Sequence, residues 1–155
     1  MNWSVSKGLF KSTLHGTTPG MGLAIYHKGP SYAIVDDSRK TVFTITAQGE
    51  LQYRIEGDAD QDGNAELVLA DKAPAFFPPR AVWLHAKLGN KQYKLKQCKN
   101  RDFIVYADDA EIGILTGMLQ RKPQLILPDT MGAVYAALLY TLALIMLHED
   151  DIELV

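Results

Sequence analysis

The chain is poor in cysteine, and its first residues do not predict an export signal. It holds one cysteine in 155 residues. An internal disulfide framework or a cysteine-rich zinc module needs at least two thiols, so both are excluded. The start, residues 1–10, has no apolar run of signal-peptide length and no small-residue cleavage pattern. We therefore expect a cytoplasmic protein, either free or peripheral to the membrane.

Catalytic signatures are also missing. The four histidines are dispersed and form no HxH or HExxH pair, so no zinc-type site is predicted. The sequence has no GxSxG elbow and no Walker A loop, and Gly20-Met21-Gly22 lacks the third glycine of a dinucleotide fingerprint. The sequence therefore predicts a protein without enzymatic activity.

The composition indicates one globular domain over residues 1–155. Hydrophobic residues make up 47% of the chain and charged residues 22%, with 16 basic against 18 acidic side chains, so the formal charge is 16 − 18 = −2. The charge is uneven, because residues 72–101 carry eight basic residues and no carboxylate. Two interpretations stay open: this segment faces an anionic partner, or the acidic segments neutralise it in the folded protein.

Most of the chain has the period of β-strands with one buried face. Leu51, Tyr53 and Ile55, for example, alternate with polar residues. Residues 1–22 are predicted as an irregular arm around a strand at residues 8–12, which either closes a barrel or is mobile. Strands are predicted at residues 24–27, 32–36, 41–46, 51–56, 66–70, 81–88, 92–97, 102–106, 111–118 and 124–127.

A helix is predicted over Met131 to Leu147, a run of 17 residues without a charge. It is apolar on all sides, so either lipid or protein must surround it. Its length of about 26 Å is slightly short of a bilayer span of about 20 residues. The preceding strands favour a mainly β fold, a closed antiparallel barrel of about 10–12 strands that encloses this central helix. A tail-anchored membrane protein is the alternative.

This order of elements resembles the tubby C-terminal-like superfamily, which includes phospholipid scramblases, plant LURP-one-related proteins and small bacterial relatives. The similar pieces are SYAIVDDSRKTVFTIT at residues 31–46, RDFIVYADDAEIGILTGML at 101–119, PQLILPDT at 123–130, the helix at 131–147 and the acidic HEDD at 148–151. The resemblance implies the barrel fold and an interaction with phospholipid headgroups. No segment matches a scramblase calcium site next to the helix, so scramblase activity is not carried over.

An acidic loop, GDADQDGNAEL at residues 57–67, is a candidate calcium site. Alternating carboxylates on a tight loop converge on Ca²⁺, with Gly63 at the sharp turn. An EF-hand is excluded because its twelfth position is Leu69 and its flanks are predicted strands. The alternative is a polar hairpin turn in which Asp and Gly serve backbone geometry alone. The candidate ligands are Asp58, Asp60, Asp62, Asn64 and Glu66.

A basic hairpin is the second candidate site. Gly89-Asn90 is a typical two-residue turn, which sets Leu88 opposite Lys91, His85 opposite Lys94 and Trp83 opposite Lys96. Val82, Leu84, Ala86, Tyr93 and Leu95 are predicted to point inward. The outward residues are Trp83, His85, Lys87, Lys94 and Lys96, with Arg80 near the entry. Such a face suits phosphate groups at a lipid interface. Base stacking and a solvated face with Trp83 packed under lysine stems are the alternatives.

These observations predict a non-enzymatic module that contacts anionic phospholipid headgroups through the basic hairpin. The first alternative is a calcium-stabilised structural or protein-interaction module that uses the acidic loop, and the second is the tail-anchored membrane protein. Anionic membrane lipid or a protein is the expected partner, and nucleic acid is less expected. Ca²⁺ is the one candidate cofactor.

Overall fold

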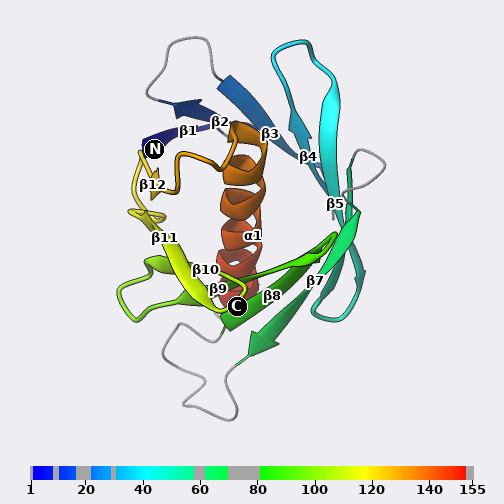
Figure 1. Cartoon of the computed structure of the whole chain (residues 1–155), viewed down its shortest axis with the longest axis vertical. Coiled ribbons are helices and arrows are strands. Elements are labelled where there is room, and N and C mark those ends of the chain that lie inside the picture. The colour runs from blue at the N-terminus through cyan, green and yellow to red at the C-terminus, as the bar shows by residue number, and fades with distance from the viewer. Residues whose placement is uncertain are drawn as a thin grey trace.

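The residues that the structure describes include twelve strands and one helix (Figure 1). The computed structural model describes residues 2–8, 11–16, 22–28, 31–57, 62–69 and 81–152. The elements are β1 (Asn2–Lys7), β2 (Lys11–Gly16), β3 (Gly22–Lys28), β4 (Ser31–Val35), β5 (Thr41–Gly49), β6 (Gln52–Glu56), β7 (Gly63–Leu69), β8 (Ala81–Leu88), β9 (Lys91–Gln97), β10 (Phe103–Ala107), β11 (Ala110–Thr116), β12 (Gln124–Ile126) and α1 (Ala133–Ile152).

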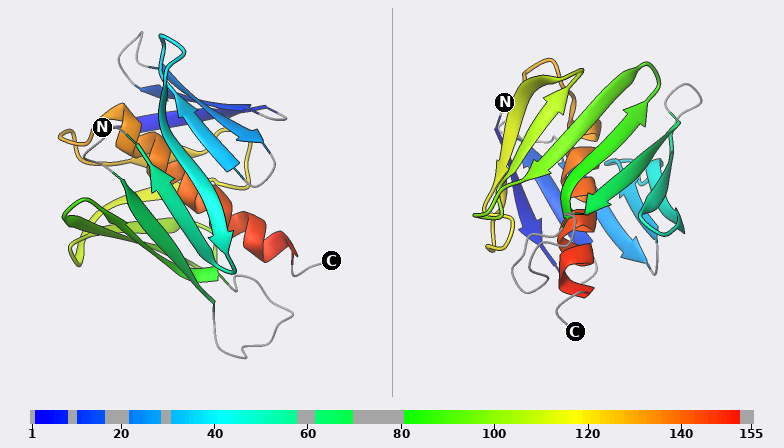
Figure 2. Two further views of the ribbon diagram at one scale, coloured as in Figure 1. Left: turned by 90° about the vertical axis from the view of Figure 1, so that its right-hand side faces the viewer. Right: turned by 90° about the horizontal axis from the view of Figure 1, so that it is seen from below.

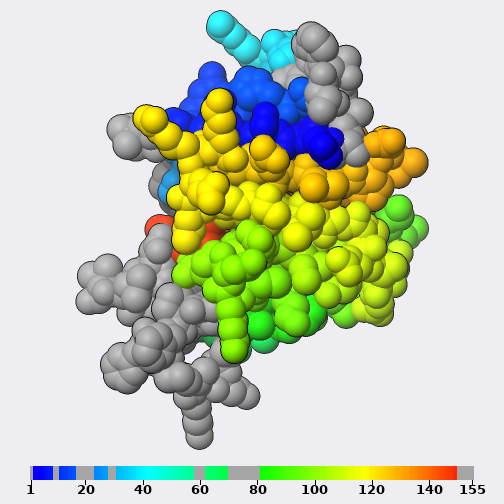
Figure 3. All heavy atoms as spheres, turned by 90° about the vertical axis from the view of Figure 1, so that its left-hand side faces the viewer, coloured from blue at the N-terminus to red at the C-terminus, as the bar shows by residue number. Residues whose placement is uncertain are grey.

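The strands form one closed antiparallel barrel, which confirms the predicted fold class. Each strand pairs with the next one along the chain, and β1 pairs with β12 to close the ring. In the space-filling view, the yellow residues around β12 lie directly against the blue residues of β1 (Figure 3). Because the ring is closed, no strand of the barrel is left with an unpaired edge.

The N-terminal segment closes the barrel. Its described residues form the two strands β1 and β2, so the prediction of an irregular arm over residues 1–22 is wrong for this part. The inward residues Trp3 and Val5 of β1 are buried, and Leu14 is the one fully buried residue of β2. Trp3 pairs with Gly16, and a Cβ on Gly16 would meet the indole ring at 2.7 Å. Glycine is therefore needed there for the ring to pack.

The apolar helix α1 fills the barrel. Figure 1 shows it within the ring of strands, and in the left view of Figure 2 it passes between the blue and the green strands. Residues 136–143 are all buried, and Thr141 donates its hydroxyl hydrogen to the Ala137 carbonyl oxygen at 2.7 Å. The surrounding strands account for a helix that is apolar on every side. Within the described ranges, no helix combines the length and the apolarity that crossing a membrane requires.

The boundaries of α1 differ from the predicted 131–147. The helix begins at Ala133 and continues to Ile152, so the acidic residues after His148 extend it. Glutamate has a favourable helix propensity, and Glu149 is held by a hydrogen bond that the Tyr53 hydroxyl donates at 2.8 Å. This contact fixes the last turns of the helix to β6.

The β8–β9 hairpin has the predicted register. Leu88 pairs with Lys91, His85 with Lys94 and Trp83 with Lys96, and Gly89 has the positive φ of 58° that the two-residue turn requires. One inward residue was predicted wrongly. A β-bulge against β7 makes Ala81 the buried residue at the start of β8 and leaves Val82 half-buried. An extra residue in one strand shifts its alternation by one position.

Candidate functional site

The β8–β9 hairpin gathers five of the six predicted lipid-contacting residues on its outer face. The sixth, Arg80, lies outside the described residues. The inward neighbours Leu84 and Leu95 are fully buried, and the pleat therefore turns the alternate side chains away from the core. The gathered residues are Trp83, His85, Lys87, Lys94 and Lys96.

Trp83 lies in a small aromatic cluster. Its ring centroid is 5.8 Å from that of Tyr106 on β10 and 6.3 Å from that of His85. The Lys96 ammonium lies over the indole ring at 5.6 Å, within the range of a cation–π interaction. The indole is half-buried as a result. Trp83 therefore has the packing expected of a solvated face, and it also places its aromatic surface beside a cation.

Part of the positive charge of the hairpin is neutralised. The β10–β11 turn consists of Asp108 and Asp109, both with positive φ, and it leans over the start of β9. Asp108 accepts a hydrogen bond from the Gln92 backbone N–H at 3.1 Å, and Asp109 accepts one from the Lys94 ammonium at 2.6 Å. The hydrogen bond from Lys94 and its positive charge lower the pKa of Asp109. At Lys94, an acidic residue from another segment therefore neutralises the positive charge, as one of the two interpretations predicts.

Lys87 and Lys96 differ from Lys94 in this respect. Among the described residues, the structure gives neither of them a carboxylate within ion-pair distance. Lys87 pairs across the sheet with Asn64 and Gln92, and Lys96 pairs with Trp83 and Ile104. No described carboxylate therefore competes with an external anion for these two charges.

An outward row of five apolar residues and one lysine, named here the apolar row, crosses the same half of the barrel. Each of the strands β7 to β12 contributes one residue, and each residue pairs in register with the next. Val68 is 39% exposed at one end of the row and Ile126 is 49% exposed at the other. The row consists of Val68, Trp83, Lys96, Ile104, Ile114 and Ile126.

This row is absent from the sequence predictions, although the sequence contains a signal for it. Residues 103–106 and 112–115 are apolar without the usual polar alternation, which indicates strands that are apolar on both faces. The other half of the barrel has no such row between β5 and β6, where the outward residues are Thr44, Thr46, Arg54 and Glu56. The apolar row of β7 to β12 therefore has no counterpart on β5 and β6.

The two predicted sites are neighbours on this surface. Glu66 of β7 pairs with His85, and Asn64 pairs with Lys87. A groove with a volume of about 380 Å³ lies along β7, β8 and β9, and its lining includes Glu66, Lys87 and Lys94. The outward polar residues of β7 thus border the basic hairpin.

The structure places the acidic loop only in part. Asp58 and Asp60 lie outside the described residues, and the described ranges contain no cluster of three or more His, Cys, Asp or Glu side chains that could hold a metal ion. Asp62 accepts a hydrogen bond from the Gly57 backbone N–H at 2.9 Å, the geometric role expected of a hairpin turn. Gly63 does not make the sharp turn that was predicted, because it is the first residue of β7 and approaches the Lys87 carbonyl of β8.

Comparisons with protein-family models, with curated proteins and with solved structures found no match to this chain. The resemblance to the tubby C-terminal-like superfamily accordingly stays a prediction.

The calcium interpretation can be tested by thermal unfolding of the full chain with Ca²⁺ or with a chelator. Binding to the acidic loop predicts a higher Tm in Ca²⁺, because a ligand that binds only the folded state stabilises it. Asp58→Asn should then abolish the difference, and Asp37→Asn, on the exposed β4–β5 turn, should retain it. An unchanged Tm in Ca²⁺ would leave the loop as a hairpin turn.

Proposed function

We propose that this protein is a non-enzymatic binding module of the tubby-like type that contacts anionic phospholipid headgroups through the outer face of β7 to β12. The observation that carries the proposal is the cross-strand apolar row with Lys96 in its interior, together with Lys87, which lies two outward positions along β8 from Trp83. A peripheral membrane protein needs apolar groups that enter the interface and cations that meet the lipid phosphates. The outer face of β7 to β12 carries both kinds of group.

The apolar and the cationic residues contribute to membrane binding in different ways. Trp83 has an apolar ring and a polar indole N–H, a combination that favours the boundary between acyl chains and headgroups. Lys96 holds its ammonium over this ring, 5.6 Å from the ring centroid. Each lysine near an anionic leaflet contributes about 1 kcal/mol to binding, and salt weakens this contribution.

Vesicle binding tests the proposal directly. The full chain should bind vesicles of phosphatidylcholine with phosphatidylserine at low ionic strength, and binding should fall as salt is added. The chain has two tryptophans, and Trp3 is only 1% exposed, so a change of fluorescence on binding reports Trp83. Equal binding to vesicles of phosphatidylcholine alone would contradict the proposal.

Two substitutions should shift the affinity in opposite directions. Lys96→Gln should weaken binding to anionic vesicles about fivefold, since it removes one available cation. Asp109→Asn should strengthen it by about the same factor, because it releases Lys94 from its 2.6 Å ion pair. Asp109 is 80% exposed, so its replacement leaves the core unchanged.

Matched controls separate this local effect from net charge. Lys40→Gln and Asp37→Asn make the same charge changes on the β4–β5 turn, where both residues are exposed. Neither should change vesicle affinity by more than about twofold. If the controls act as strongly as Lys96→Gln and Asp109→Asn, binding follows the charge of the whole molecule and the assigned face is wrong.

A further inference from the structure

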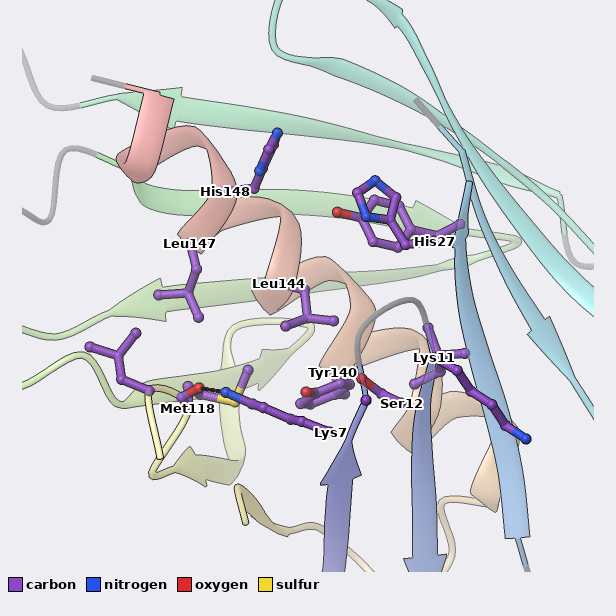
Figure 4. Close-up of a pocket in the computed structure, with 13 residues that line it drawn as sticks. Lys7, Lys11, Ser12, His27, Met118, Tyr140, Leu144, Leu147 and His148 are labelled. Atoms are coloured by element: carbon purple, nitrogen blue, oxygen red, sulfur yellow. Dashed lines mark hydrogen bonds between the residues drawn. The ribbon is translucent and has the colours of Figure 1, made fainter. Parts of the chain in front are cut away.

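A separate cavity lies at the end of the barrel where α1 ends. Its volume is about 310 Å³, at the lower end of the roughly 300–1,000 Å³ typical of small-molecule pockets. The ends of β1 to β4, the loop after β11 and the C-terminal half of α1 contribute its walls (Figure 4). None of the residues of the proposed lipid-binding row lines it.

One side of the cavity carries a positive charge without a carboxylate. Lys7 donates a short hydrogen bond to the carbonyl oxygen of Met118, and this neutral acceptor is its partner among the described residues. Burial of the ammonium lowers the pKa of Lys7. An ammonium has three donor hydrogens, so Lys7 retains donors for a bound anion.

The rest of the wall beside Lys7 is apolar. Figure 4 shows Leu144 and Leu147 of α1 directed into the space, with Met118 beside the Lys7 ammonium. Met118 is 1% exposed and Leu147 is 6% exposed, so both side chains are almost completely shielded from water. Such a surface accommodates an alkyl chain.

A buried hydroxyl group also faces this cavity without a regular hydrogen bond. Tyr140 of α1 is completely buried, and its hydroxyl forms no hydrogen bond of normal geometry in the described part of the chain. Burial raises the pKa of Tyr140, and the neighbouring Ser12 hydroxyl opposes this in part. A hydroxyl can donate one hydrogen bond as well as accept, so Tyr140 beside Ser12 retains a hydrogen for a ligand acceptor.

The opposite rim is formed by aromatic residues. His27 stacks on Tyr32 with ring centroids 4.3 Å apart, and His148 approaches His27 edge-on at 6.3 Å. Glu149 follows on α1, but it accepts the hydrogen bond from Tyr53 and does not line the cavity. Among the described residues, the lining thus contains lysine and histidine side chains and no carboxylate.

We propose that this cavity binds a medium-chain alkyl anion, with the anionic head on Lys7 and Tyr140 and the chain along Met118, Leu144 and Leu147. The volume fits one such chain. The head is a carboxylate, as in a fatty acid, or a phosphate, as in an alkyl phosphate, because both accept hydrogen bonds from an ammonium and a hydroxyl.

Isothermal titration of the full chain with octanoate, octyl phosphate and octanol tests this proposal. At least one of the two anions should bind about tenfold more tightly than octanol, and which anion binds better identifies the head. From butanoate to octanoate, affinity should rise about fourfold for each added methylene. Octanol binding as tightly as both anions would overturn the proposal.

Two lysines give a matched pair of variants. Lys7→Gln should weaken binding of the preferred anion about tenfold. Lys11 also lines the cavity, but its ammonium lies over the Tyr26 ring at 5.5 Å and points away in Figure 4, so Lys11→Gln should leave the affinity unchanged. An equal loss in the two variants would overturn the assigned position of the head.

Methyl NMR locates the chain independently of these variants. The Met118 methyl resonance should shift on titration with the preferred anion, and that of Met131, before the start of α1, should not. A shift at Met131 without one at Met118 would place the ligand elsewhere and refute the site. Vesicle binding through Trp83 does not depend on this result, so the two proposals can fail separately.

Discussion

Leu142→Ala should lower the free energy of unfolding by about 2–5 kcal/mol. Leu142 is completely buried on α1, in the middle of the barrel. The cost of such a truncation depends on how far the neighbours can move into the space. The strands around the helix form a closed hydrogen-bonded ring, so they cannot close in on one side without breaking pairs on another. We therefore expect a value in the upper half of this range.

Urea unfolding followed by tryptophan fluorescence measures this change, and Leu144→Ala provides the control. Leu144 lies on the same helix, but it is partly buried and borders the existing cavity. Its truncation enlarges a space that is already open, so the expected loss is no more than about half as large. Equal losses at the two positions would contradict the enclosure of α1 by the barrel.

The sequence predicted the elements whose pattern is set locally. The central helix follows from a long run without charge, and the β8–β9 register follows from a two-residue turn that aligns both strands. The strands β1 and β2 escaped detection because each has few apolar residues. In β2, Leu14 is the one fully buried side chain, and a single residue establishes no period.

The functional surfaces depend on contacts between distant segments, which explains why the sequence predicted them only in part. Trp83, His85, Lys87, Lys94 and Lys96 were found together because they share one hairpin. The apolar row needs the register of five successive strand pairs, and a β-bulge alters the register between β7 and β8. The cavity needs contacts such as that between Lys7 and Met118, which are 111 residues apart. No pattern of neighbouring residues predicts a contact between residues so far apart in the sequence.

Gly63→Ala should destabilise the protein by about 1–3 kcal/mol. A Cβ on Gly63 would lie 2.0 Å from the Lys87 carbonyl oxygen, a backbone atom of the paired strand β8. A backbone atom inside a sheet cannot rotate away as a side chain can, so β7 and β8 must separate locally. Because Asn64 and Lys87 are paired next to this contact, the separation also reaches the basic face.

Gly49→Ala is the matched control for this substitution. Gly49 ends β5, and a Cβ there meets no atom within 4 Å. The same change should therefore be neutral or stabilise the protein by up to about 1 kcal/mol, because it restricts the unfolded chain. Equilibrium unfolding of both variants distinguishes two roles for Gly63. A loss confined to Gly63→Ala identifies the residue as the point of closest approach between β7 and β8, and equal stability in both variants would show that β7 has room to move there.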